Sequence, residues 1–204
     1  MGGCDGYTNK IEKMLLNFAK YTSAEKKLIK RIQTYDWAKL ERLWNKIKAS
    51  KKTGWADGKA LEYMFVRAFD LEGAEVVYPY NNQVLNAQEQ LDGYVYVKDL
   101  GAGFIIECKD WTGNVSFDEL AKLHGRLIYR MASTYGIFLS KTGYTPSAVE
   151  LMYMMQPHNV IMWNSDDVDE CFKHHKFLKA LKYKFQYAMV TTDPMIAVMD
   201  GINI

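Results

Sequence analysis

The chain has 204 residues, of which 49% are hydrophobic and 25% are charged, and its net charge at pH 7 is +2. This is enough for one sizeable hydrophobic core, and no apolar run approaches the ~20 residues that a membrane helix needs. The cysteines (Cys4, Cys108, Cys171) are scattered and odd in number, which argues against a disulfide framework. The first residues contain no apolar signal-peptide core. We therefore expect a soluble cytoplasmic protein with no membrane association.

Charge is distributed unevenly along the chain. Residues 1–52 hold 13 Lys and Arg against 5 Asp and Glu, whereas the remainder holds 13 against 19. A basic segment in front of an acidic one suits a polyanionic partner bound through its phosphates. A solvated basic helical face is the simpler alternative.

Residues 9–50 are predicted to be helical, because apolar side chains recur there at positions i, i+3, i+4 and i+7. A break is expected near Thr34 and Tyr35, and Ser23 is a candidate helix cap. Residues 51–54 resemble a hinge. The predicted organisation is a basic helical N-terminal extension over residues 1–55 and a main domain over residues 56–204.

The main domain opens with a predicted helix over residues 57–71, in which Glu62 lies beside an apolar stripe. Three strands follow, at 75–80, 91–97 and 104–109. Asn81 and Asn82 give a turn signal after the first strand, and residues 100–103 form the turn before the third. Strands joined by short turns predict an antiparallel meander.

The second half of the chain alternates helices with strands. Ser116 and Glu119 have the spacing of a capping box for a helix over residues 117–134. Strands at 135–140 and 159–163 enclose a helix over 145–155. A last helix is expected over 166–187, and residues 190–204 form a further strand or a packed arm. The whole pattern predicts an α/β fold with a mixed central sheet, made of the antiparallel meander and crossover strands and flanked by helices.

Charged residues stand at the ends of two of the predicted strands. The apolar run from residue 104 ends in Glu107, Cys108 and Lys109, and Asp92 stands near the start of the preceding strand. Successive side chains of a strand alternate between faces, so Glu107 and Lys109 share one face and Cys108 takes the other. Charges at the end of a buried strand are costly unless they are paired or bind something. These residues are therefore a candidate active site.

The residue types match a divalent-metal site. Mg²⁺ prefers oxygen ligands, usually one or two carboxylates with water and phosphate oxygens. Asp92 and Glu107 supply two carboxylates, the backbone carbonyl of Cys108 a third oxygen, and Glu62 is a further candidate ligand. Lys109 is positioned to hold a water and to offset charge that develops on a phosphate. The chemistry that this set predicts is metal-assisted phosphodiester hydrolysis.

The order of these pieces resembles the PD-(D/E)xK nuclease superfamily, whose core is a helix, a three-stranded meander, a helix and a strand. The matching segments are residues 58–62 (GKALE), 90–93 (QLDG) and 105–109 (IIECK). Further downstream, residues 135–145 and 160–167 resemble the Mrr-like restriction endonucleases, and residues 107–113 resemble NERD nuclease domains. Together the resemblance covers about residues 57–172.

The resemblance implies the restriction-endonuclease-like fold and an Mg²⁺-dependent DNA endonuclease, for which Mn²⁺ is a substitute. It assigns catalysis to Glu62, Asp92, Glu107 and Lys109, with no small-molecule cofactor. Because this fold usually needs two active sites to cut both strands, it also implies a homodimer by analogy. The chain departs from the family in its short QLDG loop. It also lacks the glutamine that the family often carries on the helix after the lysine, where this chain offers Lys122 and His124.

Two alternatives remain open at this point. The same fold could be kept as a catalytically inactive DNA-binding or assembly module. RNA is an alternative substrate, because phosphate contacts carry no information about the sugar. A zinc site at Cys171, His174 and His175 is disfavoured, because their spacing fits no standard zinc motif.

Overall fold

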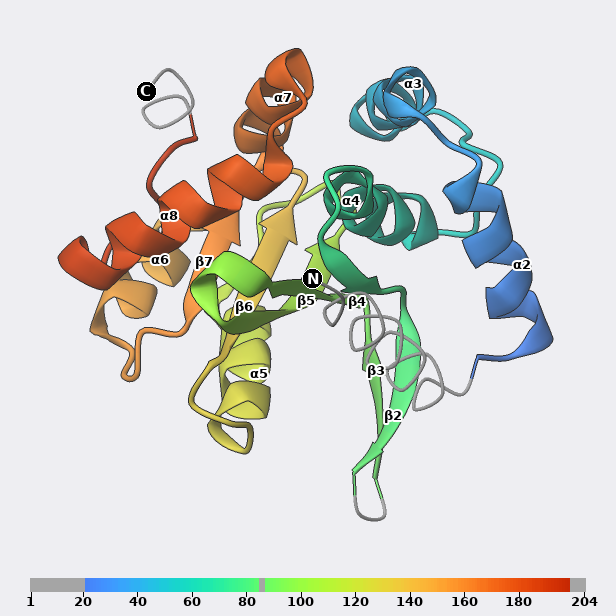
Figure 1. Cartoon of the computed structure of the whole chain (residues 1–204). Helices are drawn as coiled ribbons and strands as arrows, with labels where there is room; N and C mark the ends of the chain where they lie inside the picture. Colours follow the sequence, from blue (N-terminus) through green and yellow to red (C-terminus); the bar gives the residue numbers. More distant parts are fainter. Residues whose placement is uncertain (1–20, 85–86, 199–204) are drawn as a thin grey trace, which may run out of the picture.

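The computed structural model of the chain describes residues 21–84 and 87–198 (Figure 1). Its centre is a five-stranded sheet with the strand order β1-β4-β5-β6-β7. The first three strands in this order are antiparallel, and β5, β6 and β7 are parallel. The strands are β1 (Glu75–Val77), β4 (Gly93–Val97), β5 (Ala102–Lys109), β6 (Thr134–Ser140) and β7 (Val160–Trp163). The mixed α/β sheet expected from the sequence is therefore confirmed.

Helices cover both faces of this sheet (Figure 1). One hydrophobic cluster joins the sheet to α3, α4, α7 and α8, and a second joins its opposite face to α5 and α6. The helices are α2 (Ser23–Gln33), α3 (Trp37–Lys48), α4 (Lys59–Leu71), α5 (Phe117–Ile128), α6 (Pro146–Met154), α7 (Ser165–His174) and α8 (Phe177–Thr191), with a 3₁₀ turn η1 (Lys98–Leu100). No helix in the described ranges is both long and apolar enough to cross a bilayer.

Strand β5 lies in the middle of the sheet and is covered on both faces. Phe104, Ile106 and Cys108 belong to the cluster on the α4 side, whereas Ile105 belongs to the cluster on the α5 side. A strand that is buried on both faces reads as a continuous apolar run, which is why the sequence identified it. The same alternation leaves Cys108 on the face opposite to that of Glu107, as predicted.

A second, two-stranded sheet was not expected. β2 (Tyr80–Val84) and β3 (Ala87–Leu91) pair antiparallel and form a ribbon that projects from the body (Figure 1). The predicted turn at Asn81 and Asn82 is wrong, because cross-strand pairing with β3 holds both residues in β2. The strand predicted over 91–97 is confirmed as β4, but it begins at Gly93, and Leu91 belongs to β3 instead.

Two predicted helix caps differ from the structure. The N-cap of α2 is Thr22 rather than Ser23, and Thr22 forms a capping box with Glu25. Ser116 is the N-cap of α5, but its side chain makes no capping hydrogen bond. The predicted capping box is wrong because Glu119 pairs with Lys109 and Lys122 instead.

The C-terminal region contains two helices where one was predicted over residues 166–187. His175, with a left-handed φ of 50°, ends α7 and separates it from α8. Beyond α8 the chain packs as an arm, in which the carbonyl of Pro194 accepts from Met162 N. Val198 is fully buried, and its N–H donates to Asp167. The rest of the predicted tail, from residue 199, lies outside the described residues.

The N-terminal helices share the core of the main sheet. Leu40, Leu43 and Trp44 of α3 are buried in the same cluster as α4. The indole N–H of Trp44 donates to Asp169 of α7 at 2.7 Å. The stripe predicted before residue 21 lies outside the described residues, and the domain boundary at residue 55 stays a prediction.

Candidate active site

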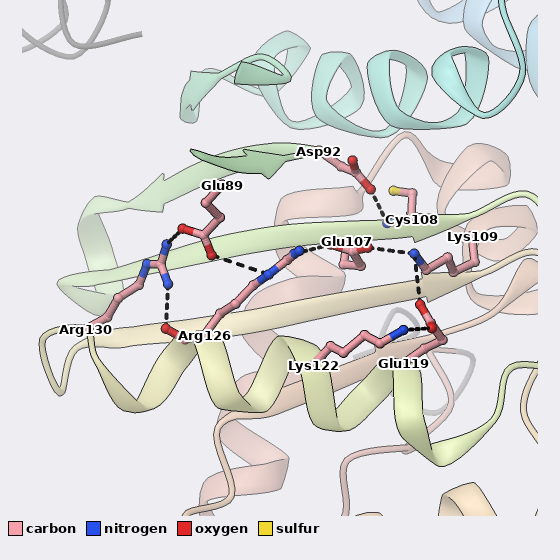
Figure 2. A network of polar contacts seen from close by, with 9 residues as sticks. All are labelled: Glu89, Asp92, Glu107, Cys108, Lys109, Glu119, Lys122, Arg126 and Arg130. Carbon is pink, nitrogen blue, oxygen red and sulfur yellow. Dashed lines mark hydrogen bonds and ion pairs between the residues drawn. The ribbon is translucent and has the colours of Figure 1, made fainter. Parts of the chain in front are cut away.

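The site begins where β4 and β5 stop pairing. The last paired residues are Gly93 and Ile106, and Asp92 precedes Gly93. Instead of continuing the ladder, the Asp92 carboxylate Oδ2 accepts a hydrogen bond from Cys108 N at 2.9 Å (Figure 2). Asp92 therefore lies against the peptide that joins Glu107 to Cys108.

The Glu107 carboxylate lies between two cations (Figure 2). Its Oε1 is 2.8 Å from Lys109 Nζ, and its Oε2 is 2.8 Å from Arg126 Nη1. Only 13% of the Glu107 side chain is exposed. Charge-assisted hydrogen bonds on both oxygens offset the cost of burying this carboxylate.

Lys109 has a second acidic partner. Its Nζ lies 3.2 Å from Oε2 of Glu119 and 5.4 Å from the ring centroid of Trp111. Burial lowers the pKa of Lys109, but the hydrogen bonds and charges of Glu107 and Glu119 outweigh burial and raise it above the ordinary value. Lys109 is therefore held as a cation at neutral pH.

Helix α5 supplies partners that sequence reasoning missed. Glu119 and Arg126 face β5 from this helix, with Lys122 bound to Glu119 (Figure 2). Positions 119, 122 and 126 are three and four residues apart, which places them on one helical face. That spacing was the available signal, but the sequence predicted a local cap for Glu119 and no role for Arg126.

The network continues to the ribbon. Glu89 of β3 lies 3.4 Å from Arg126 Nε and also pairs with Arg130, just past the end of α5. Arg126 therefore contacts Glu89 and Glu107 at the same time (Figure 2). The ribbon and the strand end are thus joined through one guanidinium group.

Asp92 carries the strongest electrostatic perturbation of the site carboxylates. Burial, together with the charges of Glu62 and Glu107, raises the pKa of Asp92 to about 7, although the Cys108 hydrogen bond and Lys59 lower it. Glu62 and Glu107 are therefore close enough to Asp92 to disfavour its ionisation. Such mutual repulsion is typical of a site that binds a cation.

Glu62 stands in the first turn of α4 and is 7% exposed. Its carboxylate forms an ion pair with Lys59 at 2.6 Å. Burial raises the pKa of Glu62, and Lys59 opposes this effect. Glu62 thus borders the site with a charge that is already partly neutralised.

The donor chemistry at the strand ends fits a hard divalent cation. Asp92 and Glu107 offer carboxylate oxygens, and Asp92 has no ion pair with a described residue. The N–H and C=O of one strand residue point to the same side, so the Cys108 carbonyl points to the edge of β5 on which its N–H binds Asp92. Across residues 21–84 and 87–198, no three His, Cys, Asp or Glu side chains already form a metal cluster. Binding a cation at Glu107 therefore competes with Lys109 and Arg126.

Other candidate residues lie away from these strand ends. His124 Nε2 is 3.2 Å from the Pro157 carbonyl, so it faces the loop before β7 rather than the site. Cys171 is fully buried in the core. His174 pairs with Glu170 at 3.3 Å, whereas His175 stacks on Trp37.

Comparisons with known proteins identify a family for the central part of the chain. The model of the Mrr catalytic domain, described as a restriction endonuclease, matches residues 55–172, which is more than half of the sequence. No curated protein matches the chain.

Several solved structures are similar to this chain. The protein of unknown function AF1548 is 12% identical, with a TM-score of 0.45 over 63% of this chain and 76% of that one. Protein VC1899 from Vibrio cholerae is 18% identical, with a TM-score of 0.44 over 60% of this chain and 34% of that one. The DNA modification-dependent restriction endonuclease AspBHI is 15% identical, with a TM-score of 0.38 over 74% of this chain and 37% of that one. The chain thus spans about a third of the length of the last two proteins.

Proposed function

Because the chain belongs to the Mrr family of restriction endonucleases within the PD-(D/E)xK superfamily, we propose that it is an Mg²⁺-dependent endonuclease that hydrolyses phosphodiester bonds in DNA. The observation that carries the proposal is the hydrogen bond from Cys108 N to the Asp92 carboxylate. It brings Asp92 to the strand end at which Glu107 and Lys109 form an ion pair. Two carboxylates, a peptide oxygen and a lysine held as a cation are the groups that this hydrolysis needs.

We assign the metal ligands to Asp92, Glu107 and the backbone carbonyl of Cys108, with Glu62 as a further candidate. A bound Mg²⁺, or Mn²⁺ in its place, supplies Lewis acidity to the phosphate and lowers the pKa of a water. The raised pKa of Asp92 suits this role, because a divalent cation relieves the repulsion among the three carboxylates.

Lys109 is proposed to orient the attacking water and to stabilise the charge that develops on the phosphate. Its raised pKa makes it a hydrogen-bond donor rather than a proton acceptor. Glu119 is a positioning residue, since it contacts Lys109 and no reacting atom. Preorganised donors of this kind are usually the largest contribution to such catalysis.

One observation favours a second candidate function, a nuclease fold retained for DNA binding or assembly without cleavage. Both oxygens of Glu107 are bound by cations, so the carboxylate is not free for a metal. The two candidates differ in whether a divalent ion displaces these contacts. Metal titration of the free protein separates them, because only the enzyme should bind Mg²⁺ through Asp92 and lose that binding in Asp92→Asn.

Cleavage of plasmid and linear duplex DNA with Mg²⁺, Mn²⁺ or EDTA tests the proposal directly. We expect Lys109→Ala and Glu107→Gln to lose at least a hundredfold in rate while keeping a wild-type circular dichroism spectrum. Lys173→Ala, on an exposed lysine of α7 that is paired with Glu170, is the matched control. The enzyme assignment fails if the wild type cuts no DNA with either metal, or if Lys109→Ala cuts as well as the wild type.

Two properties of the assembly are also proposed. The chain is proposed to act as a homodimer by analogy with nucleases that cut both strands. The basic extension, residues 1–55, is proposed to add phosphate contacts. Sedimentation of the protein with and without duplex DNA tests whether it forms a homodimer. The phosphate contacts are tested by comparing the salt dependence of DNA binding between the full chain and a Lys51→Ala, Lys52→Ala variant.

A further inference from the structure

A groove and a cavity adjoin where α3 and the loop before α4 meet. The groove, which we call the α3 groove, has a volume of about 270 Å³ and is lined by Tyr35, Lys39, Arg42, Leu43, Lys46 and Thr53. The cavity, which we call the hinge cavity, has a volume of about 480 Å³, and its lining includes Lys51, Lys52, Thr53, Trp55, Asp110 and Thr112. Thr53 lines both, so the two are neighbours.

The α3 groove is lined by three cations and by no carboxylate of a described residue. Lys39, Arg42 and Lys46 follow one another at intervals of three and four positions, which places them on one face of α3. Arg42 and Lys46 are exposed, and neither forms an ion pair with a residue of 21–84 or 87–198. Elsewhere on the same helix, Lys48 pairs with Asp169 of α7. The cations of the groove are therefore available to a negatively charged ligand.

The hinge cavity extends this positive charge. Its described lining contains three lysines (Lys51, Lys52 and Lys141) and two aspartates (Asp57 and Asp110). Lys141 is paired with Asp110. Lys51 and Lys52 are exposed and have no ion pair within the described ranges. The groove and the cavity together thus present four unpaired cations along one path.

The hinge cavity borders the candidate active site. Asp110 of its lining directly follows Lys109, whose carbonyl accepts a hydrogen bond from Lys141 N. Gly58 also lines the cavity, and a Cβ at this position would lie 3.6 Å from Glu62 Oε1. The path that begins at α3 therefore ends beside the residues to which cleavage is assigned.

An aromatic pair lies along the path. Tyr35 lines the groove and Trp55 lines the cavity, with ring centroids 6.3 Å apart and 79° between the ring planes. Trp55 is covered by Arg31, 4.3 Å from its centroid, and also packs against Tyr63. The edge-on contact with Trp55 covers at most one face of Tyr35. Proteins that hold single-stranded nucleic acid combine such a cationic groove with an aromatic ring on which a base stacks.

We infer that the α3 groove and the hinge cavity bind a single-stranded segment of the DNA substrate and lead it to the active site. The inference rests on the proposed function, which makes DNA the ligand. Cavities of about 300–1,000 Å³ enclose small-molecule ligands, and one nucleotide is of that size. A duplex, whose major groove alone is about 12 Å wide, is too broad to enter. The preferred substrate is therefore duplex DNA with a single-stranded extension beside the cut.

DNA binding in EDTA, measured by fluorescence anisotropy, tests this preference without cleavage. The ligands are a blunt duplex and duplexes with a 5′ or a 3′ single-stranded extension, all with the same number of phosphates. We expect the wild type to bind one of the extended duplexes about tenfold more tightly than the blunt duplex, because a stacked base adds to the phosphate contacts. Equal affinity for all three ligands overturns the inference.

A double variant of the groove tests the phosphate contacts. Arg42→Ala with Lys46→Ala should remove the preference for the extended duplex. It should also lower the slope of log affinity against log salt for a single-stranded oligonucleotide by about 1.4, which is about 0.7 for each lost contact. Lys98→Ala with Lys173→Ala removes the same charge at exposed positions outside the groove and the cavity, and should keep both properties. A groove variant with the wild-type preference and slope contradicts the inference.

Tyr35 tests the stacking contact. Tyr35→Ala should weaken binding of the single-stranded oligonucleotide about fivefold or more, whereas Tyr35→Phe keeps the ring and should bind as the wild type. Tyr35 also packs against the core, so thermal melts accompany the measurement. If Tyr35→Ala does not fold, the groove double variant at exposed positions still decides the question. A folded Tyr35→Ala protein that binds as tightly as the wild type rules out the stacking contact and with it the inference.

Cleavage separates failure of this inference from failure of the proposed function. Tight binding of the extended duplex that depends on Arg42 and Lys46, by a protein that never cuts with Mg²⁺ or Mn²⁺, would support the groove and overturn the enzyme. Equal cleavage of blunt and extended duplexes, with the groove variant as active as the wild type, would support the enzyme and overturn the groove.

Discussion

Arg126 Nη1 lies 2.8 Å from Glu107 Oε2, so one oxygen of the strand-end carboxylate is bound by a cation from helix α5. The other oxygen is bound by Lys109. Two protein cations therefore lie beside the carboxylate oxygens to which a divalent ion would bind. We therefore expect stronger ion pairs of Glu107 with Lys109 and Arg126 to weaken metal binding at Glu107.

The first prediction follows from this competition. Arg126→Ala should tighten Mg²⁺ binding about threefold to tenfold, because it removes a positive charge beside a ligand carboxylate. Isothermal titration calorimetry of the free protein with Mg²⁺ and Mn²⁺ measures the change. Arg126→Lys keeps the charge and should behave as the wild type. Unchanged or weaker binding by Arg126→Ala would show that Glu107 is not a ligand.

The second prediction concerns Glu119, which holds Lys109 from helix α5. Glu119→Gln removes a negative charge that raises the pKa of Lys109, so that pKa should fall. We expect a several-fold slower cleavage and an alkaline limb of the pH–rate profile that moves to lower pH. Asp118→Asn, an exposed neighbour on the same helix, should leave the profile in place. If Glu119→Gln slows cleavage but leaves the alkaline limb of the pH–rate profile in place, Glu119 does not act through the pKa of Lys109.

The third prediction concerns stability and pH. The folded-state pKa of Asp92 is raised to about 7, above its ordinary value of 3.8, so ionised Asp92 destabilises the fold. This loss is absent below about pH 4 and complete above about pH 7. In EDTA at pH 8, the free energy of unfolding of Asp92→Asn should therefore exceed that of the wild type by on the order of 1 kcal/mol or more. The variant should accordingly unfold at a higher temperature.

The same measurement has internal controls. The advantage of Asp92→Asn should shrink at pH 5, because the folded wild type then carries a neutral Asp92. Mg²⁺ at pH 8 should stabilise the wild type more than the variant. Asp57→Asn, at an exposed position, should show none of these differences. A variant that is less stable than the wild type in EDTA at pH 8 would refute the raised pKa.

The fourth prediction concerns Gly93, which directly follows Asp92. A Cβ at this position would come within 2.4 Å of Val66 Cγ2 on α4 and 3.6 Å of Ile106 Cδ1. Gly93→Ala should therefore cost about 1–3 kcal/mol in free energy of unfolding and, by moving β4, impair cleavage. Gly125→Ala on α5 meets nothing within 4 Å and should stabilise by about 0.5–1 kcal/mol. Denaturant melts of both variants decide the comparison.

The sequence predicted the central strands well because their signal is local. The run from Phe104 to Lys109 is apolar since β5 is buried on both faces, and its polar end follows directly. The ribbon was missed for the opposite reason. Asn81 and Asn82 favour turns when considered alone, and only pairing with Gln90 and Glu89 makes them a strand.

In the candidate site too, the sequence predicted the residues with a local signal and missed those that depend on distant contacts. Asp92, Glu107 and Lys109 were found from strand ends and spacing. Glu119 was assigned to a cap, because the local rule sees Ser116 three residues away but not Lys109 across the fold. Arg126 has its partner 19 residues away in sequence, a contact that no short-range rule describes.

Cys108 contacts Asp92 through its backbone and not through its side chain. Its N–H binds Asp92, its side chain is buried on the far face of the sheet, and burial together with the nearby carboxylates raises the pKa of its thiol. The thiol therefore stays protonated and sheltered from alkylating reagents. What position 108 requires is a peptide unit and a small apolar side chain. Other small apolar residues should therefore be tolerated at position 108 without a change in the chemistry of Glu107 and Lys109.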